Sequence, residues 1–499
     1  MLRRSLVRYF LLFCCIAGHL GAQTINIPAV ATGDGAADDT VSIQTAINSS
    51  PLGAVIDFGS ASKIYRVTNT ITFPGGRTYT GAATIKLALA PNGGLQLIML
   101  PLGNADDTTI SGLTFDAGGF SAVMHIATTG VGNVAPTDIS ITGCTFKNSI
   151  PGNNTAPNVG SGIYNTVGVV NLTLSGNTFA NLSHGLSIVN PSNLVASGNT
   201  FQTITSGDAM YFQIWEPLSL LTITNNVGNN FYRMAVEIQT MRATGSFGLP
   251  VTLNNVTVQN NDFENWTPSG DYGFGLSLVF QGANCTVSGN RLLNGVMGYG
   301  IEDGSPGCVV DSNTISGFAE GIGITTPNAV VTNNQISGQS DSGIEITNAN
   351  AEVNTRIVGN TITNAKNAGI QMVFGDHHGS LIQGNSILRQ GGAFPDDATV
   401  VFSGIVISGG LTAAITVNDN SITQTAVAPV PGFGFLELRS WATRRARSMT
   451  AITSRQIPPP PWGLVSTSGM ARTWMAIRFR TLPCAICCGC RTGSHRAIS

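Results

Sequence analysis

Apolar and polar residues alternate in short runs along most of the chain, as in the stretches VSGNRL and SGIEI. Alternation with a period of two is the pattern of a β-strand, whereas an amphipathic helix would repeat its apolar residues three and four positions apart. Glycine, asparagine and serine separate the runs, and these residues favour tight turns. The pattern therefore predicts an all-β chain of many short strands.

One phrase of this pattern, an apolar strand with an asparagine at its turn, returns at intervals of 21 to 35 residues. Such repeats predict a parallel β-solenoid, in which each coil stacks on the previous one about 4.8 Å away. We expect the asparagines to hydrogen-bond along a ladder and to tolerate the left-handed backbone of the corner. They are Asn177, Asn199, Asn226, Asn261, Asn290, Asn313, Asn334, Asn360, Asn385 and Asn420, with Leu113 and Cys144 in the equivalent place of the first two copies.

A second phrase, glycine–apolar–x–apolar, follows most of these asparagines by about ten residues. Because successive side chains of a strand point to opposite faces, the apolar residues point into the core and x points outward. Glu345 in SGIEI therefore belongs to an exterior column and is expected to lie unburied. The x positions are Tyr164, Ser187, Tyr211, Glu237, Ser277, Glu302, Gly323, Glu345, Gln371 and Val406, with His125 preceding them.

Three glutamates occupy every second coil of this column, with Ser277 and Gly323 between them. Carboxylates two coils apart lie about 9–10 Å from each other, and inverting glycosidases hold their acid and base roughly 6.5–9.5 Å apart. The small residues between them would leave a shallow channel for a sugar ring. We expect Glu302 and Glu345 to form the acid–base pair. Further candidates are Glu237 and Asp303 for catalysis, and Tyr211, Trp215, Arg233, Tyr299, Gln371 and His377 for substrate binding.

These acids also have a purely structural interpretation, because glutamates on alternate coils keep a solenoid soluble and avoid stacking like charges. The run Asp376-His377-His378 has two interpretations as well. It could supply a proton-transfer histidine or metal ligands, or it could be a turn with polar tips. Adjacent residues of a strand point to opposite faces, so we assign no metal site.

Charge is distributed unevenly along the chain. Residues 23–430 hold 25 acidic against 11 basic residues, whereas residues 431–499 hold ten arginines and one acid, Glu437. An acidic body argues against a nucleic-acid partner, because phosphate contacts need lysine and arginine. It also repels polyuronates unless calcium bridges the two. The charge therefore favours a neutral or weakly acidic polysaccharide as the partner.

The stretch GDGAADDTVSIQTAI, Gly33 to Ile47, resembles the opening of the pectate-lyase-like (rhamnogalacturonase/epimerase-like) superfamily. The resemblance implies a right-handed parallel β-helix that acts on or binds a polysaccharide. Asp38, Asp39 and Thr40 can cap a short helix with Val41, Ile43, Ala46 and Ile47 on one apolar face, which would cover the open end of the solenoid. The N-T-D, G-H-G, R-I-K and D-P-H-E signatures of enzymes in that superfamily do not occur here.

The two ends of the chain differ from the repeats. Residues 1–22 resemble a secretory signal peptide, with Arg3, Arg4 and Arg8 before an apolar run. Residues 23–100 are expected to form the cap and first coils, and residues 101–430 the repeats. Residues 431–499 lack strand periodicity; we interpret them as a disordered or frameshifted end, or alternatively as a basic anchor to an anionic surface. Its Cys484, Cys487, Cys488 and Cys490 lack the second spaced pair of a zinc site.

Cys285 and Cys308 each precede a repeat asparagine by five residues, in consecutive coils. They are expected to stack within the distance of a disulfide. A small apolar stack is equally open, because Ala329 takes the same place in the next coil.

The sequence predicts a monomeric, secreted, periplasmic or cell-surface protein without a membrane span, and it favours hydrolysis of a polysaccharide without a cofactor. A calcium-dependent lyase or epimerase is the first alternative. A non-catalytic glycan-binding protein is the second.

Overall fold

The computed structural model describes residues 22–89, 96–101, 103–121, 123–128, 134–149, 160–240, 251–267, 273–346, 353–373, 375–390, 402–408, 415–424, 436–440 and 453–454. The chain divides into two units, Met1–Ile457 and Pro458–Ser499, and every described residue belongs to the first. The first 21 residues of the predicted signal peptide and the cysteines of the tail lie outside the described residues.

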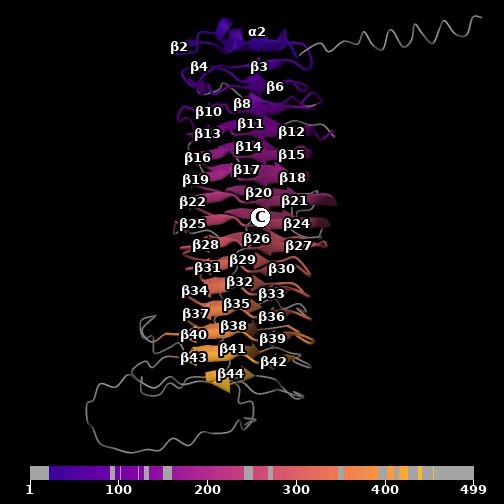
Figure 1. The fold of residues 1–499 in the computed structure, drawn as a ribbon, viewed down its shortest axis with the longest axis vertical. Helices are drawn as coiled ribbons and strands as arrows, with labels where there is room; N and C mark the ends of the chain where they lie inside the picture. The colour runs from indigo at the N-terminus through magenta and orange to yellow at the C-terminus, as the bar shows by residue number, and fades with distance from the viewer. Residues whose placement is uncertain are drawn as a thin grey trace, which may run out of the picture. The chain divides into compact units, whose positions relative to one another are not determined.

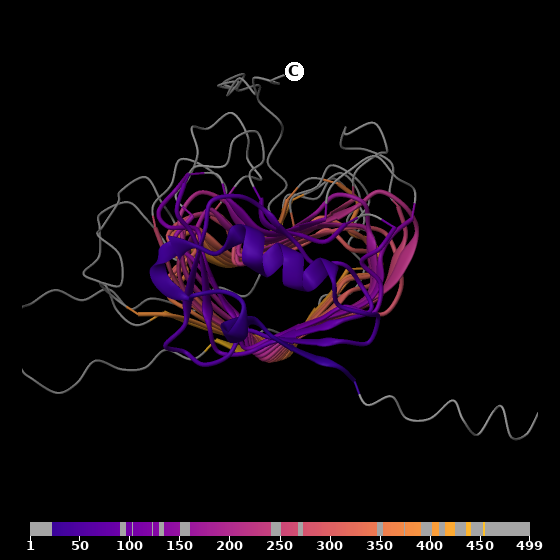
Figure 2. The same ribbon diagram turned by 90° about the horizontal axis from the view of Figure 1, so that it is seen from above.

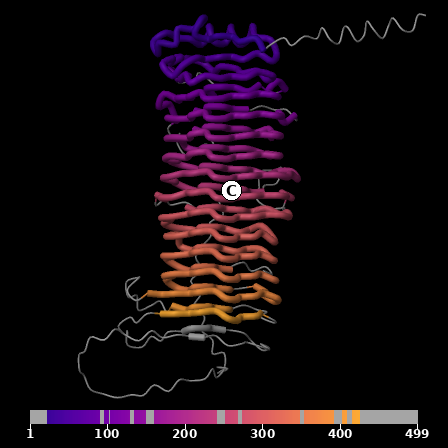
Figure 3. Tube along the Cα trace, viewed as in Figure 1, coloured from indigo at the N-terminus to yellow at the C-terminus, as the bar shows by residue number. Residues whose placement is uncertain are grey.

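The first unit is a stack of coils, each of which contributes strands to three parallel sheets, here called A, B and C (Figure 1). The coils follow one another in chain order along the stack (Figure 3). Sheet A, in its spatial order, consists of β1 (Thr24–Asn26), β3 (Val55–Asp57), β6 (Thr78–Thr80), β9 (Thr109–Ser111), β12 (Thr137–Thr142), β15 (Val169–Ser175), β18 (Pro191–Ser197), β21 (Leu218–Thr224), β24 (Leu253–Gln259), β27 (Cys285–Ser288), β30 (Val309–Asp311), β33 (Val330–Thr332), β36 (Arg356–Val358), β39 (Leu381–Gln383) and β42 (Thr416–Asn418).

Sheet B follows sheet A along each coil, and its strands begin directly after the repeat asparagines. It consists of β2 (Asp34–Asp38), β4 (Ile64–Val67), β7 (Thr84–Leu87), β10 (Thr114–Asp116), β13 (Thr145–Lys147), β16 (Thr178–Leu182), β19 (Thr200–Ile204), β22 (Val227–Phe231), β25 (Asp262–Trp266), β28 (Arg291–Leu293), β31 (Thr314–Ser316), β34 (Gln335–Ser337), β37 (Thr361–Thr363), β40 (Ser386–Arg389), β43 (Ser421–Gln424) and β45 (Thr453–Ser454).

Sheet C holds the glycine–apolar–x–apolar phrases. It consists of β5 (Ile71–Thr72), β8 (Gln96–Met99), β11 (Met124–Thr128), β14 (Ser161–Asn165), β17 (His184–Val189), β20 (Met210–Ile214), β23 (Val236–Thr240), β26 (Leu276–Val279), β29 (Tyr299–Asp303), β32 (Glu320–Ile324), β35 (Ser342–Ile346), β38 (Ala368–Val373), β41 (Ser403–Ser408) and β44 (Leu436–Ser440). β44 and β45 lie beyond residue 430, where the sequence suggested that the repeats end.

The predicted asparagine ladder is confirmed, and it runs unbroken from Asn177 to Asn420. Each Nδ2 donates to Oδ1 of the next asparagine at 2.8 to 3.0 Å. That oxygen also accepts the backbone N–H of the preceding asparagine. The prediction that these residues occupy the left-handed backbone is wrong by one position. Gly176, Gly198 and Asn225, each directly before a ladder asparagine, have φ values of 63°, 64° and 56°.

The glycines at the start of the sheet C strands are required by packing. A Cβ at Gly321 would lie 2.4 Å from the carbonyl oxygen of Gly343 on the next coil and 2.4 Å from Cγ2 of Ile336 in the core. Distances under about 3 Å would force the neighbouring backbone to move, since a packed interior has no space to spare. These glycines therefore let sheet C close onto the core.

The N-terminal end of the stack is covered by the 3₁₀ helix η1 (Ile27–Ala29) and the helix α2 (Thr40–Asn48) (Figure 2). Ile43, Ala46 and Ile47 are buried as predicted, but Val41 is 75% exposed. Val41 lies two residues before Ile43, about 200° away around the helix, so it cannot share that face.

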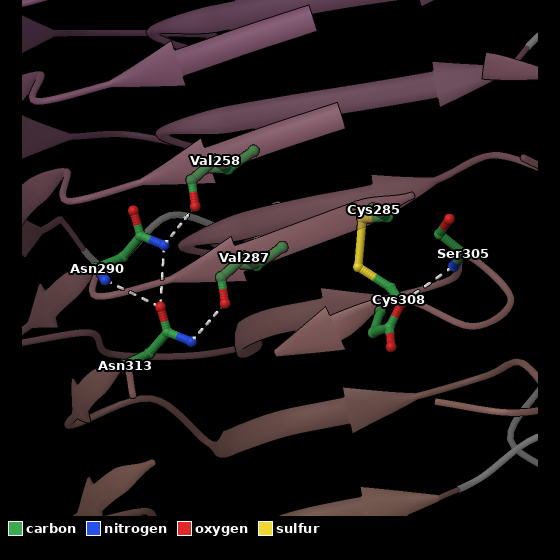
Figure 4. Close-up of a disulfide and its surroundings, with 8 residues drawn as sticks. Val258, Cys285, Val287, Asn290, Ser305, Cys308 and Asn313 are labelled. Carbon is green, nitrogen blue, oxygen red and sulfur yellow. Dashed lines mark hydrogen bonds between the residues drawn. A yellow bond between two sulfur atoms is a disulfide. The ribbon is translucent and has the colours of Figure 1, made fainter. Parts of the chain in front are cut away.

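Cys285 and Cys308 form a disulfide with a Cα–Cα distance of 4.6 Å (Figure 4). It joins β27 to the residue before β30, so it links two neighbouring coils on the inner side of sheet A. The first of the two arrangements that the sequence left open is therefore present.

Candidate functional site

The outward positions of sheet C form one column in register, which we call the outer column. Its members pair from coil to coil in the predicted order: Tyr164, Ser187, Tyr211, Glu237, Ser277, Glu302, Gly323, Glu345, Gln371 and Val406. The residue before Tyr164 is Ala127, not His125. His125 is fully buried, and its ring contacts Phe146 and the carbonyl oxygens of Lys147 and Ser161.

The expectation that these outward carboxylates lie unburied is wrong. Glu237 is 2% exposed and Glu345 is 9% exposed. Outward orientation does not guarantee hydration here, because polar side chains lie against these carboxyl groups: Arg233 against Glu237 and Gln371 against Glu345. Burial disfavours the charged form of a carboxyl group, so it raises the pKa values along the column.

At the N-terminal side of the column, Asp208, Arg233 and Glu237 form what we call the Arg233 cluster. Nη1 of Arg233 lies 2.7 Å from Oδ2 of Asp208 and 2.8 Å from Oε2 of Glu237. Asp208 is fully buried and also accepts the backbone N–H of Met234. Burial and the neighbouring Asp208 raise the pKa of Glu237 to about 9 although Arg233 opposes the shift. Two carboxyl groups thus share one guanidinium group.

Glu302 lies two coils further along. Its Oε2 accepts the hydroxyl of Ser277 at 2.6 Å, and burial raises its pKa although that hydrogen bond opposes the shift. The next member of the column is Gly323, over which the ring of Tyr299 lies. A Cβ at Gly323 would come within 2.5 Å of two ring carbons. The channel predicted between Glu302 and Glu345 therefore contains an aromatic ring, which also contacts Phe274 edge-on at 5.3 Å.

Glu345, Glu320, Asp341 and Gln371 form what we call the Glu345 cluster. Nε2 of Gln371 donates to Oε1 of Glu345 at 3.1 Å. Burial and the charge of Asp341 raise the pKa of Glu345 to about 7. Burial and the charges of Glu345 and Asp341 raise the pKa of Glu320 to about 7. Both carboxyl groups are therefore partly protonated near neutral pH.

Glu320 and Asp341 were missed by the sequence analysis because they stand at or before strand starts, outside the repeated phrase. Glu320 pairs with Tyr299 of the preceding coil. Asp341 lies four residues before Glu345, and its charge at that spacing could have indicated that it belongs to the site.

Several predicted site residues lie apart from these clusters. Asp303 and His377 are both 0% exposed, so neither reaches a polysaccharide on the outer face. Tyr211 stays in the outer column, and its hydroxyl donates to Oε1 of Gln239 at 3.3 Å. Trp215 follows β20 and donates its backbone N–H to Oδ1 of Asn190. Trp266, the last residue of β25, packs in the core against Phe231 and Phe318.

The described part of the chain contains no group of three or more His, Cys, Asp or Glu side chains placed to hold a metal ion. It also contains no helix with the length and apolar character needed to cross a bilayer. His378, the exposed member of the histidine pair, bonds Oδ2 of Asp376 at 2.7 Å and so forms a polar turn.

Comparison with known proteins supports the fold. Residues 219–387 match a family described as "Right handed beta helix region". With three parallel sheets, this confirms the right-handed parallel β-helix that the resemblance implied. A search of curated protein sequences found no match.

Solved structures with a similar chain path share little sequence. Tailspike protein 3 of bacteriophage CBA120 is 13% identical with a TM-score of 0.43, and the match covers 82% of this chain and 62% of that chain. This chain therefore spans less than two thirds of that tailspike. The catalytic unit of a GH87 α-1,3-glucanase from Streptomyces thermodiastaticus is 13% identical with a TM-score of 0.42, covering 85% and 68%. PfbA, a surface adhesin of Streptococcus pneumoniae, is 17% identical with a TM-score of 0.41, covering 81% and 93%.

Proposed function

We propose that this protein hydrolyses a glycosidic bond of a neutral polysaccharide on the outer face of sheet C. The observation that carries the proposal is Glu345, a shielded carboxyl group of the outer column whose pKa is raised to about 7. A carboxyl group with that pKa is still partly protonated at neutral pH and can donate a proton to a leaving oxygen.

Glu345 acts as the general acid in this proposal, and Glu302 acts as the base. Burial raises the pKa of Glu302, which makes it a stronger base, and the hydroxyl of Ser277 donates to it and partly opposes that rise. The two residues stand two coils apart in register. That separation, about 9–10 Å between backbones, leaves room for the water that an inverting hydrolase activates. The charge of Glu345 contributes to the raised pKa of Glu320, so Glu320 is also partly protonated near neutral pH.

The charge of the face favours a neutral sugar. Asp208, Glu320 and Asp341 add acidic groups around the column. Arg233 already contacts two carboxyl groups, those of Asp208 and Glu237. A uronate would therefore meet carboxylates rather than a cation on this face.

The same proposal places the protein outside the cytoplasm. Disulfides persist in oxidising compartments, and Cys285–Cys308 is one. The signal-like sequence before Gln23 supports export as well. Mass spectrometry of the exported protein tests this, with a mature N-terminus at Gln23 as the expected result and an intact Met1 as the contrary one.

The activity is tested by incubating the purified protein with plant and bacterial polysaccharides, with calcium and with a chelator. Reducing ends and the ultraviolet absorbance of unsaturated uronates are followed together. We expect reducing ends without absorbance, and a loss of about 100-fold or more in Glu345→Gln and in Glu302→Gln. Glu264→Gln, on sheet B beside Arg291, is the matched control and keeps its activity. Calcium-dependent absorbance would identify a lyase instead, and no product across the panel would favour a non-catalytic glycan-binding protein.

A further inference from the structure

The inner side of β29 holds a carboxyl group that the proposed hydrolysis does not use. Asp303 follows Glu302 in the strand, so it faces inward, where its partners on the neighbouring coils are Leu278 and Ile324. Its side chain is 0% exposed. An ionised carboxylate in apolar surroundings is strongly unfavourable unless another group compensates its charge.

The polar atoms around Asp303 are only partly satisfied. Oδ1 accepts the backbone N–H of Ser305 at 3.1 Å, close to the disulfide (Figure 4). Oδ2 has no hydrogen-bond partner among the described residues, and neither do the buried hydroxyls of Ser305 and Thr326. Ser305 and Thr326 are 0% and 8% exposed.

These three oxygen atoms lie on two successive coils, at the turn that leads from sheet C to sheet A in each. The backbone N–H of Thr325 donates to the carbonyl oxygen of Asp303 at 3.0 Å, which places Thr326 on the coil beside Ser305. A buried polar atom without a partner in a native protein indicates an ordered water or ion at that place. Three such atoms at one turn indicate a built site.

The charge decides between water and an ion. Burial raises the pKa of Asp303 to about 7, so at pH 8 the group is mostly ionised, and no lysine, arginine or histidine of the described residues offsets that charge. Hydroxyl groups and water complete hydrogen bonds but bring no positive charge. Carboxylate and hydroxyl oxygens are ligands of hard cations, and calcium sites use several carboxylates where this site has one.

We propose that Asp303, Ser305 and Thr326 bind a sodium ion inside the solenoid. One positive charge balances the single carboxylate, and the two hydroxyl oxygens complete the coordination from both coils. The ion ties the coil of β29 to the coil of β32 at the turn behind the outer column. This site is independent of the proposed hydrolysis.

The test measures the melting temperature of the full chain at pH 8 in sodium chloride and in tetramethylammonium chloride of equal ionic strength. We expect a saturable rise that is about 2 °C larger with sodium at roughly ten times its dissociation constant. Asp303→Asn removes this difference. Asp311→Asn, which changes a carboxylate on the outer face of β30, is the matched control and retains it.

The variants Ser305→Ala and Thr326→Val provide a second test of the sodium site, because both keep the carboxylate of Asp303. Each is expected to shift the sodium midpoint to a higher concentration. The proposal is overturned by equal melting in the two salts, or by a sodium effect that persists in Asp303→Asn. Stabilisation by millimolar calcium in place of sodium, or unchanged midpoints in both hydroxyl variants, also overturns it.

Discussion

The ring of Tyr299 lies directly over Gly323, so close that a Cβ at position 323 would come within 2.5 Å of two ring carbons. Gly323 separates Glu302 from Glu345 in the outer column. The absence of a side chain at this one coil is therefore what allows an aromatic ring to lie between the two proposed catalytic carboxyl groups. A sugar bound between them would contact that ring, and aromatic faces suit the apolar side of a sugar.

Gly323→Ala is expected to displace the Tyr299 ring. We predict a loss of about 1–3 kcal/mol in the free energy of unfolding, as for other additions to a packed site, and at least a tenfold loss of hydrolysis. Urea unfolding and initial rates measure the two effects. In the double variant Gly323→Ala/Tyr299→Ala the clash is gone, so its stability is expected to match that of Tyr299→Ala alone. Additive losses in this cycle would show that the ring and the glycine do not interact.

The stability of the protein is expected to fall as the pH rises from about 4.5 to about 7. Glu320 and Glu345 have pKa values raised from 4.5 to about 7 in the folded protein. In that interval the unfolded chain has released protons that the folded chain still holds, so the free energy of unfolding decreases with pH. Urea midpoints between pH 4 and 8 measure this. Glu345→Gln is expected to flatten the decline, and an unchanged slope in that variant would contradict the assignment.

Asn313→Ala is expected to destabilise the protein by about 3 kcal/mol. Its Oδ1 accepts two hydrogen bonds from Asn290, and its Nδ2 donates to Val287 and Asn334 (Figure 4). Truncation leaves buried donors and acceptors unsatisfied, at about 1–3 kcal/mol each before relaxation. Asn229→Ala is the control, because its bonds to Glu264 and Asn265 lie where water can replace them. Equal losses in the two variants, measured by urea unfolding, would mean that burial of the ladder is irrelevant.

Leu220→Asn is expected to stabilise the protein by about 1 kcal/mol. Leu220 has a φ of 65° and is 46% exposed. This left-handed backbone conformation costs residues other than glycine and asparagine about 1–2 kcal/mol. Its neighbours on adjacent coils are Asn193 and Asn255, which have the same backbone conformation. Leu220→Ala keeps the strain and is expected to give no gain. A melting temperature raised equally by both substitutions would show that the exposed side chain, not the backbone, is the cause.

The coil repeat and the order of the outer column could be predicted because one asparagine marks the same corner of each coil. Once Asn313 and Asn334 are aligned, the position of Glu302 relative to Gly323 follows from counting residues. His125 was misplaced because its coil has Leu113 in place of the marker asparagine, and Ala127 is the residue in register with Tyr164.

Burial and the charges that depend on it could not be predicted in the same way. Alternation gives the direction of Glu237 and Glu345 but not what lies against them, which is Arg233 from the turn before β23 and Gln371 from the next coil. Glu320 stands at a strand start that no repeated phrase marks. Asp303 follows an outward residue and therefore faces inward, a conclusion that period-two alternation already contained.

The disulfide between Cys285 and Cys308 has a mechanical consequence. Each coil hydrogen-bonds only to the coils beside it. A chain pulled from its C-terminal end is therefore expected to unfold one coil after another. The disulfide passes the pulling force from Cys308 directly to Cys285, so the residues between them stay inside a closed loop and add no length to the extended chain. The coil that contains this loop is therefore expected to release less chain than its neighbours, and reduction of the disulfide is expected to restore the full length.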